Sequence, residues 1–239
     1  MSRHSHWAKI KHGKGAADVK KGAIFTKLAR SITVAAREKG PDPNFNFKLR
    51  LAIDQARASN MPKDNIDRAI ARATGEGADI SLEELLYEGI LPGGVGTIIE
   101  ATSDNKNRTT NEVKKILSDF GGTMAGGGAV SWNFLKLGVI GLSPEEPREK
   151  EDLELKLIDA GAEEIKDEDG EIHVYTKPEN LEKMKNALEN DKIKIEFAGL
   201  EWVPKERIEV DSDTRKKLDE LFLALDESEE VSEYYTNLA

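Results

Sequence analysis

The chain of 239 residues contains no cysteine, so it has no disulfide framework, no thiolate nucleophile and no cysteine-based zinc site. It also lacks any apolar stretch near the ~20 residues that a membrane span requires. Lys9, Lys11 and Lys14 interrupt any apolar signal core at the N-terminus. We therefore expect a cytoplasmic protein with no membrane partner.

Negative charge is scarce in the first third of the chain and abundant in the rest. Residues 1–75 hold 16 Lys and Arg against 6 Asp and Glu, which is +10, and residues 76–239 hold 19 against 39, which is −20. The two parts sum to the formal net charge of −10. Because binding responds to the local field, a +10 segment attracts phosphates even on an acidic chain. The alternative is that these cations only keep solvated helices soluble.

Apolar spacing predicts three helices in the basic segment. Between residues 18 and 39, apolar side chains recur at intervals of three and four. The same pattern predicts a helix over residues 47–59 and another that opens with Pro62 and ends at Gly75. Cationic side chains are expected on the exposed faces, and residues 2–15 form a basic arm that could order on a partner. The predicted nucleic-acid-binding residues are Trp7, Lys9, Lys11, Lys14, Lys20, Lys21, Lys27, Arg30, Arg37, Arg50, Arg57, Lys63, Arg68 and Arg72.

Beyond these helices the pattern changes to mixed strands and helices. The pair Ser81 and Glu84 predicts a capping box that opens a short helix, and the pair Thr109 and Glu112 predicts another. Gly121 and Gly122 are expected to stop the second of these helices. Strands are predicted over residues 95–102 and 129–134.

A self-contained βαββαβ order follows, which is the ferredoxin-like order. Its predicted elements are strand 137–142, helix 149–160, strands near 162–166 and 172–176, helix 178–190 and strand 193–203. A last helix around residues 218–225 and a strand near 231–235 need a sheet, which residues 80–136 supply. We therefore predict an α+β multidomain protein. Its parts are a basic helical domain over residues 1–76, a discontinuous α/β domain over 80–136 plus 206–239, and an inserted acidic ferredoxin-like domain over 137–205.

Three segments carry a resemblance to a known family: residues 1–70, which begin MSRHSHWAKIKHGKGAADVKKGAIFTKLAR, YEGILPGGVGTIIEATSDNKNRT at 87–109, and GAEEI at 161–165. The chain resembles the YebC/PmpR family over nearly its whole length. This resemblance implies three domains, which are helical, α/β and ferredoxin-like. The chain departs from the family pattern at Arg3, His6, Gly13 and Leu91.

Three catalytic or ligand-binding patterns are incomplete. The overlapping string Ser103-Asp104-Asn105-Lys106 lacks the separate elements and the K-T-G of a β-lactamase-like site. The glycine-rich residues 121–128 lack both the dinucleotide spacing and a Walker lysine. The histidines of the arm, His4, His6 and His12, lack the fourth ligand of a structural zinc site. We predict no enzymatic activity, no cofactor and no metal.

Two functions stay open at this point. The charge distribution and the resemblance favour a non-enzymatic, nucleic-acid-binding transcriptional regulator that contacts promoter DNA through the helical domain. The resemblance also implies an alternative, a ribosome-associated translation factor that binds rRNA and assists stalled translation. No base-reading helix and no RNP-type aromatic pair stands out to separate the two. The acidic domains could repel non-specific nucleic acid or contact proteins.

Overall fold

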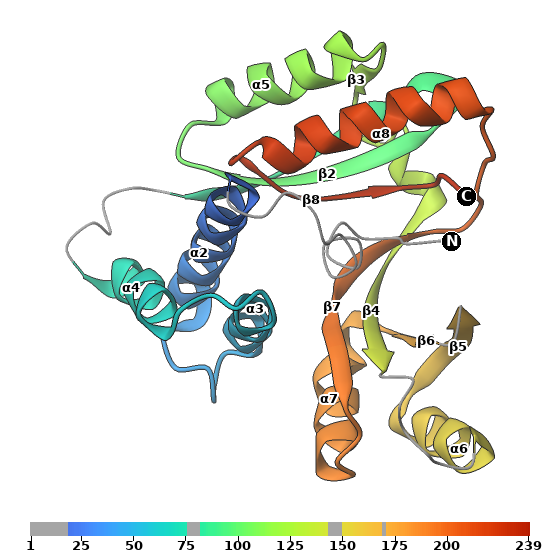
Figure 1. Ribbon diagram of the computed structural model, residues 1–239. Coiled ribbons are helices and arrows are strands. Elements are labelled where there is room, and N and C mark those ends of the chain that lie inside the picture. The colour runs from blue at the N-terminus through green and yellow to red at the C-terminus, as the bar shows by residue number, and fades with distance from the viewer. Residues whose placement is uncertain (1–18, 76–81, 143–149, 169–170) are drawn as a thin grey trace. The chain divides into compact units, whose positions relative to one another are not determined.

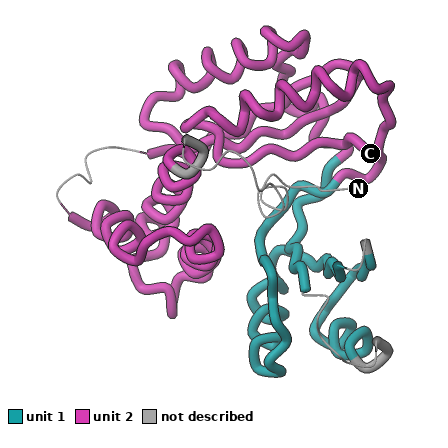
Figure 2. The backbone as a smooth tube through the Cα atoms, viewed as in Figure 1, with its two compact units in different colours: residues 1–2, 134–203 teal, residues 3–133, 204–239 magenta. Residues whose placement is uncertain are grey.

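The computed structural model describes residues 19–75, 82–142, 150–168 and 171–239 (Figure 1). Its contacts divide the chain into two compact units (Figure 2). The smaller unit is Phe134–Val203, and the larger contains the described residues up to Asn133 together with Pro204–Ala239. Three helices precede the first strand of the described chain, and the strands form two antiparallel sheets. The coarse prediction of a mixed helix-and-strand protein led by three helices is therefore confirmed.

The three leading helices of the larger unit are α2 (Val19–Lys39), α3 (Phe47–Ala58) and α4 (Lys63–Thr74). Their shared core follows the apolar spacing of the sequence and contains Leu28, Ile32, Ala35, Leu49, Ile53, Ala56, Ile66 and Ala69. The buried hydroxyl of Thr33 donates a hydrogen bond to the carbonyl oxygen of Ala69 at 2.9 Å, which joins α2 directly to α4. Asn46 begins α3, since its side chain accepts from the Leu49 amide at 3.0 Å.

The first sheet also belongs to the larger unit. Its strands are β1 (Glu83–Ile90), β2 (Gly96–Ser103), β3 (Thr123–Ala125) and β8 (Val231–Thr236), in the order β3-β1-β2-β8. Helices α5 (Lys106–Asp119) and α8 (Ser212–Glu227) cover one face of it (Figure 1). The core between helices and sheet contains Tyr87, Ile99, Val113, Leu117, Leu218, Leu221, Phe222, Leu225 and Tyr234.

The smaller unit contains the second sheet. Its elements are β4 (Phe134–Leu142), α6 (Lys150–Ala160), β5 (Ala162–Glu168), β6 (Glu171–Thr176), α7 (Leu181–Asn190) and β7 (Ile195–Pro204). The strands lie in the order β5-β6-β4-β7, so the first and last strands of the unit are neighbours. The chain therefore enters and leaves this unit along adjacent strands.

Two predicted capping boxes are wrong. Ser81 lies outside the described residues, and Glu84 lies in β1, where it pairs with Thr102 of β2, so Glu84 is not in a helix. Residues 83–90 find a partner along their whole length in β2, and this long-range pairing outweighs the local helix signal. Helix α5 begins before Thr109, because Asn105 is its N-cap and accepts from the Arg108 amide at 3.1 Å. It ends as predicted at Gly121, whose φ of +81° suits glycine.

The predicted strand over residues 129–134 is also wrong. Ser131–Asn133 forms a turn of 3₁₀-helix, and β4 begins only at Phe134. The carboxylate of Glu88 accepts hydrogen bonds from the amides of Gly128, Val130 and Ser131 at 2.7, 2.7 and 3.1 Å. These amides are then not available to a strand ladder, so the segment wraps around one side chain instead.

Candidate nucleic-acid interface

Lys27 does not lie on an exposed cationic face, which corrects the prediction from the sequence. Lys27 is only 7% exposed, and its Nζ donates to the carbonyl oxygens of Leu225 and Asp226 at 3.3 and 2.8 Å. Burial lowers the pKa of its ammonium, although Asp226 and Glu233 act in the opposite direction. Because these carbonyls end α8, Lys27 acts as a C-terminal cap for that helix.

Arg30 also binds inside the larger unit. Its guanidinium donates to the carbonyl oxygens of Glu229 and Thr102 at 2.8 and 3.3 Å and lies 3.4 Å from the carboxylate of Glu230. The side chain of Arg30 keeps 23% exposure, whereas that of Glu230 keeps 8%. Arg30 therefore joins α2 to the segment before β8 while part of it still faces solvent.

The carboxylate of Glu230 links α2 to α5 at the junction between these helices and the start of β8. It accepts from Arg108 at 2.6 Å and from the hydroxyl of Thr109 at 3.0 Å, both on α5, in addition to its contact with Arg30. Burial opposes the charged form of Glu230, but hydrogen bonds from Ser103, Arg108 and Thr109 outweigh it and lower the pKa of the carboxyl. Ser103 is buried, and its hydroxyl also accepts from the Asn105 amide at 2.9 Å. The Ser103 hydroxyl thus stabilises the turn that leads into α5.

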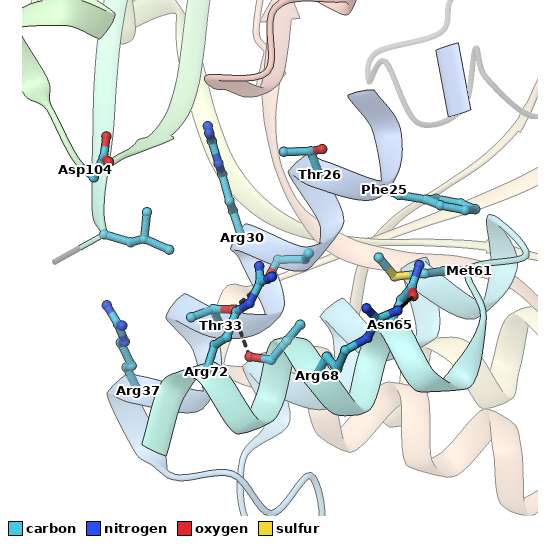
Figure 3. A pocket seen from close by; sticks show the side chains of 13 residues that line it. Phe25, Thr26, Arg30, Thr33, Arg37, Met61, Asn65, Arg68, Arg72 and Asp104 are labelled. Atoms are coloured by element: carbon cyan, nitrogen blue, oxygen red, sulfur yellow. Dashed lines mark hydrogen bonds between the residues drawn. The ribbon is translucent and has the colours of Figure 1, made fainter. Parts of the chain in front are cut away.

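A groove of about 690 Å³ runs between α2 and α4 (Figure 3). Its residues from α2 are Phe25, Thr26, Ala29, Arg30, Thr33 and Arg37, those around α4 are Met61, Asn65, Arg68, Ala69 and Arg72, and Leu82 and Asp104 complete the lining. The lining therefore contains four guanidinium groups and one carboxylate. Phe25 and Met61 lie at one end of the groove and Arg37 at the other (Figure 3). We call it the arginine groove.

The sequence of α4 places its two arginines on the groove side. Asn65, Arg68 and Arg72 are three and four residues apart, which puts them on one face of a helix. Arg68 donates to the side chain of Asn65, a contact that lies on the exposed surface of the helix. Asp64 and Asp67 are exposed but do not line the groove. Of the charged side chains of α4, only Arg68 and Arg72 line the groove.

The remaining predicted cations are dispersed. Arg50 of α3 lies over the ring of Phe47 at 5.1 Å, Arg57 forms an ion pair with Asp54 at 3.7 Å, and Lys63 is exposed at the start of α4. None of the three lines the arginine groove. Trp7, Lys9, Lys11 and Lys14 lie outside the described residues, and so do the side chains of Lys20 and Lys21.

Reasoning from the sequence missed the neutral members of the groove. Phe25 was not selected, because apolar side chains in a helix are expected in the core, and it does contact that core in part. Asn65 had a usable signal, since it shares a helix face with Arg68 and Arg72. Thr26 and Thr33 enter the groove beside Arg30 but bond to backbone carbonyls of their own helix. Such residues become site candidates only once α4 is placed against α2.

The described residues show no group of three or more His, Asp or Glu side chains that could hold a metal ion. None of the helices among them is long and apolar enough to cross a membrane. The arrangement offers charge and hydrogen-bond donors to an anion, because a guanidinium can donate two parallel hydrogen bonds to a phosphate.

Three leading helices with an arginine groove, followed by two antiparallel sheets, define the class as a mixed α/β protein. Two family models specify the class further: the TACO1/YebC protein N-terminal domain matches residues 5–76, and the TACO1/YebC second and third domain matches residues 82–238. The chain belongs to the TACO1/YebC family, which confirms the resemblance found in the sequence.

Relatives of known sequence and structure span almost the whole chain. A protein of Thermotoga maritima named "Probable transcriptional regulatory protein" is 46% identical over 237 residues, covering 99% of this chain and 93% of its own. A protein of the same printed name from Thermoanaerobacter pseudethanolicus is 42% identical over 238 residues, covering 100% and 97%. The crystal structure of a conserved hypothetical protein from Aquifex aeolicus matches with a TM-score of 0.86 at 40% identity, covering 98% of this chain and 96% of that one.

Proposed function

We propose that this protein is a non-enzymatic regulator of gene expression that binds nucleic acid through its helical region and acts on transcription. The observation that carries the proposal is the arginine groove, in which Arg37, Arg68 and Arg72 from two helices face a common space. Arginine matches the geometry of a phosphate oxygen pair, and several arginines in one groove fit a polyanion better than a small neutral ligand. The printed names of the relatives support the transcriptional role.

The charge distribution supports an oriented complex. The first 75 residues carry a net +10 and the remainder a net −20. A phosphate backbone is attracted to the first part and repelled by the second. In the proposed complex the helical region therefore supplies the phosphate contacts.

Reversing two groove cations tests the proposal. Arg68→Glu with Arg72→Glu should weaken binding of a fluorescent DNA duplex, measured by anisotropy across a series of salt concentrations. Each lost phosphate contact should also reduce the log–log salt slope by about 0.9, so by about 2 in total.

The matched control is Lys114→Glu with Lys115→Glu. It makes the same change of net charge at exposed positions of α5, outside the groove. Circular dichroism should show unchanged helicity for both variants, since all four side chains lie on the surface or at the groove. Equal losses of affinity in the two variants would mean that only net charge matters, and the groove would lose its assigned role.

One observation favours the translational alternative. The exposed surface of α4 carries Asp64 and Asp67 as well as its cations, and these two carboxylates would meet phosphates unfavourably if α4 entered a DNA major groove as a reading helix. A factor that recognises rRNA needs shape and charge but no base-reading helix. The deciding experiment is a competition between promoter duplex, scrambled duplex and purified ribosomes. A specific site should exceed scrambled duplex by ~10³ for a transcriptional regulator, whereas equal duplex affinities with tight ribosome binding would favour the alternative.

A further inference from the structure

We infer that the arginine groove takes one unpaired nucleic-acid strand, with its phosphates on the arginines and a base against Phe25. This inference rests on the proposed function and specifies the ligand of its site. The shared chemistry is a single-stranded polynucleotide, whether it comes from RNA or from unpaired DNA.

The dimensions of the groove suit a strand. Its two walls are helices in direct contact, because Thr33 of α2 donates to the carbonyl oxygen of Ala69 of α4 at 2.9 Å. Phe25 and Arg37 are twelve residues apart on α2, so the groove follows about 18 Å of helix. Its volume of about 690 Å³ falls within the ~300–1,000 Å³ that holds a molecule of nucleotide size. The groove is thus elongated along α2, a shape that fits a few linked nucleotides.

The placement of charge on α4 points to the same ligand. A helix that reads duplex DNA inserts its outward face into a major groove about 12 Å wide. On α4 the exposed Asp64 and Asp67 do not line the groove, whereas Arg68 and Arg72, which are also exposed, do line it. The favourable position for a phosphate is therefore in the groove beside these two arginines, where one phosphate backbone can lie.

Phe25 supplies a contact that a nucleic-acid strand can use and a simple anion cannot, because only the strand carries bases. Its side chain is partly exposed and lies at one end of the groove beside Met61 (Figure 3). Proteins that bind single strands combine a cationic groove with aromatic side chains on which unpaired bases stack. In a duplex the base faces are already stacked on their neighbours, so a gain from Phe25 requires an unpaired base.

The test uses the full-length protein and three labelled probes of one sequence: single-stranded DNA, single-stranded RNA and the DNA duplex. The single strands should bind at least tenfold more tightly than the duplex at equal salt. Phe25→Leu keeps an apolar side chain for the partial core contact but removes the ring, and it should weaken single-strand binding about tenfold while leaving duplex binding unchanged. Phe25→Tyr retains the ring and should bind like the parent protein.

The outcomes separate the inference from the proposed function. Equal affinity for single strand and duplex, or a Phe25→Leu variant that binds single strands like the parent, overturns the inference and leaves the proposed function standing. Failure to bind any of the probes overturns both. A preference between the RNA and DNA strands identifies the source of the ligand, because the 2′-hydroxyl is the feature that distinguishes them.

Discussion

At the scale of single residues, cationic side chains of α2 have two different roles. Lys27 is buried against the end of α8, whereas Arg37 lines the arginine groove. Arg30 lies between these extremes, since it binds Glu229 and Glu230 and also reaches the groove. A long cationic side chain can therefore hold two parts of a unit together instead of facing a ligand. Which of these two roles it has depends on the groups that it contacts in the folded protein.

Lys27→Met should reduce stability without reducing nucleic-acid binding. The substitution keeps an apolar stem of similar length but leaves the carbonyls of Leu225 and Asp226 without their donor. An unsatisfied buried acceptor costs about 1–3 kcal/mol, which urea unfolding can measure. The control is Lys39→Met at the exposed end of the same helix, which should change stability by less than about 0.5 kcal/mol. Unchanged stability together with weakened binding would show that Lys27 belongs to the nucleic-acid interface.

At the scale of elements, Glu230 connects three of them. It contacts Arg30 of α2 and both Arg108 and Thr109 of α5, and it directly precedes β8. The helix α5 reaches this contact because its N-cap is Asn105, which puts Arg108 and Thr109 in the first turn. A start at the predicted capping box would have left both outside the first turn. The position of one helix end therefore decides whether the junction can form.

Glu230→Gln should destabilise the protein most at neutral pH. The folded state lowers the pKa of Glu230, so its stabilising contribution is complete above the ordinary glutamate pKa of roughly 4.3 and is lost as the pH falls through the lower folded value. Urea unfolding at pH 7 should show a loss of about 1–3 kcal/mol, and the gap between parent and variant should narrow below about pH 4. The exposed neighbour Glu229→Gln is the control. A gap that does not change with pH would show that the charge of Glu230 is not the stabilising feature.

At the scale of the whole molecule, the smaller unit interrupts the larger one in the sequence. On the larger unit's side of the boundary, Lys205 donates its amide to the carbonyl oxygen of Asn133 at 2.8 Å, and the side chain of Asn133 bonds to the backbone of Glu206 at 2.9 and 3.0 Å. The point where the chain leaves the larger unit and the point where it re-enters that unit are therefore adjacent and joined by hydrogen bonds. This geometry supports the proposal that an inserted domain was accommodated without disturbing the first sheet.

Replacing residues 134–203 by a short Gly/Ser bridge should leave a folded protein. The bridge has only to connect Asn133 to Pro204, and closing such a short loop costs little entropy. Both the shortened protein and the isolated segment should melt cooperatively when followed by circular dichroism. An unfolded shortened protein would show that the larger unit depends on the insertion.

Local patterns determined much of the architecture from the sequence alone. The bounds of α2, α3 and α4 were predicted to within a residue or two, because their apolar residues repeat with the helical period and because Pro62 and Gly75 mark the ends of α4. The strands and helices of residues 134–204 were predicted in the correct order for the same reason. The cationic character of the helical region followed directly from composition.

Tertiary structure alone decided which side chains meet. Local signals were misleading at Glu84 and over residues 129–134, where pairing with β2 and the carboxylate of Glu88 take the backbone hydrogen bonds. The buried position of Lys27 depends on α8, which lies about 200 residues further along the chain. Periodicity reports which face of a helix is apolar, but it contains no information about the element that covers the opposite face. The arginine groove could therefore be assembled only after α4 had been placed against α2.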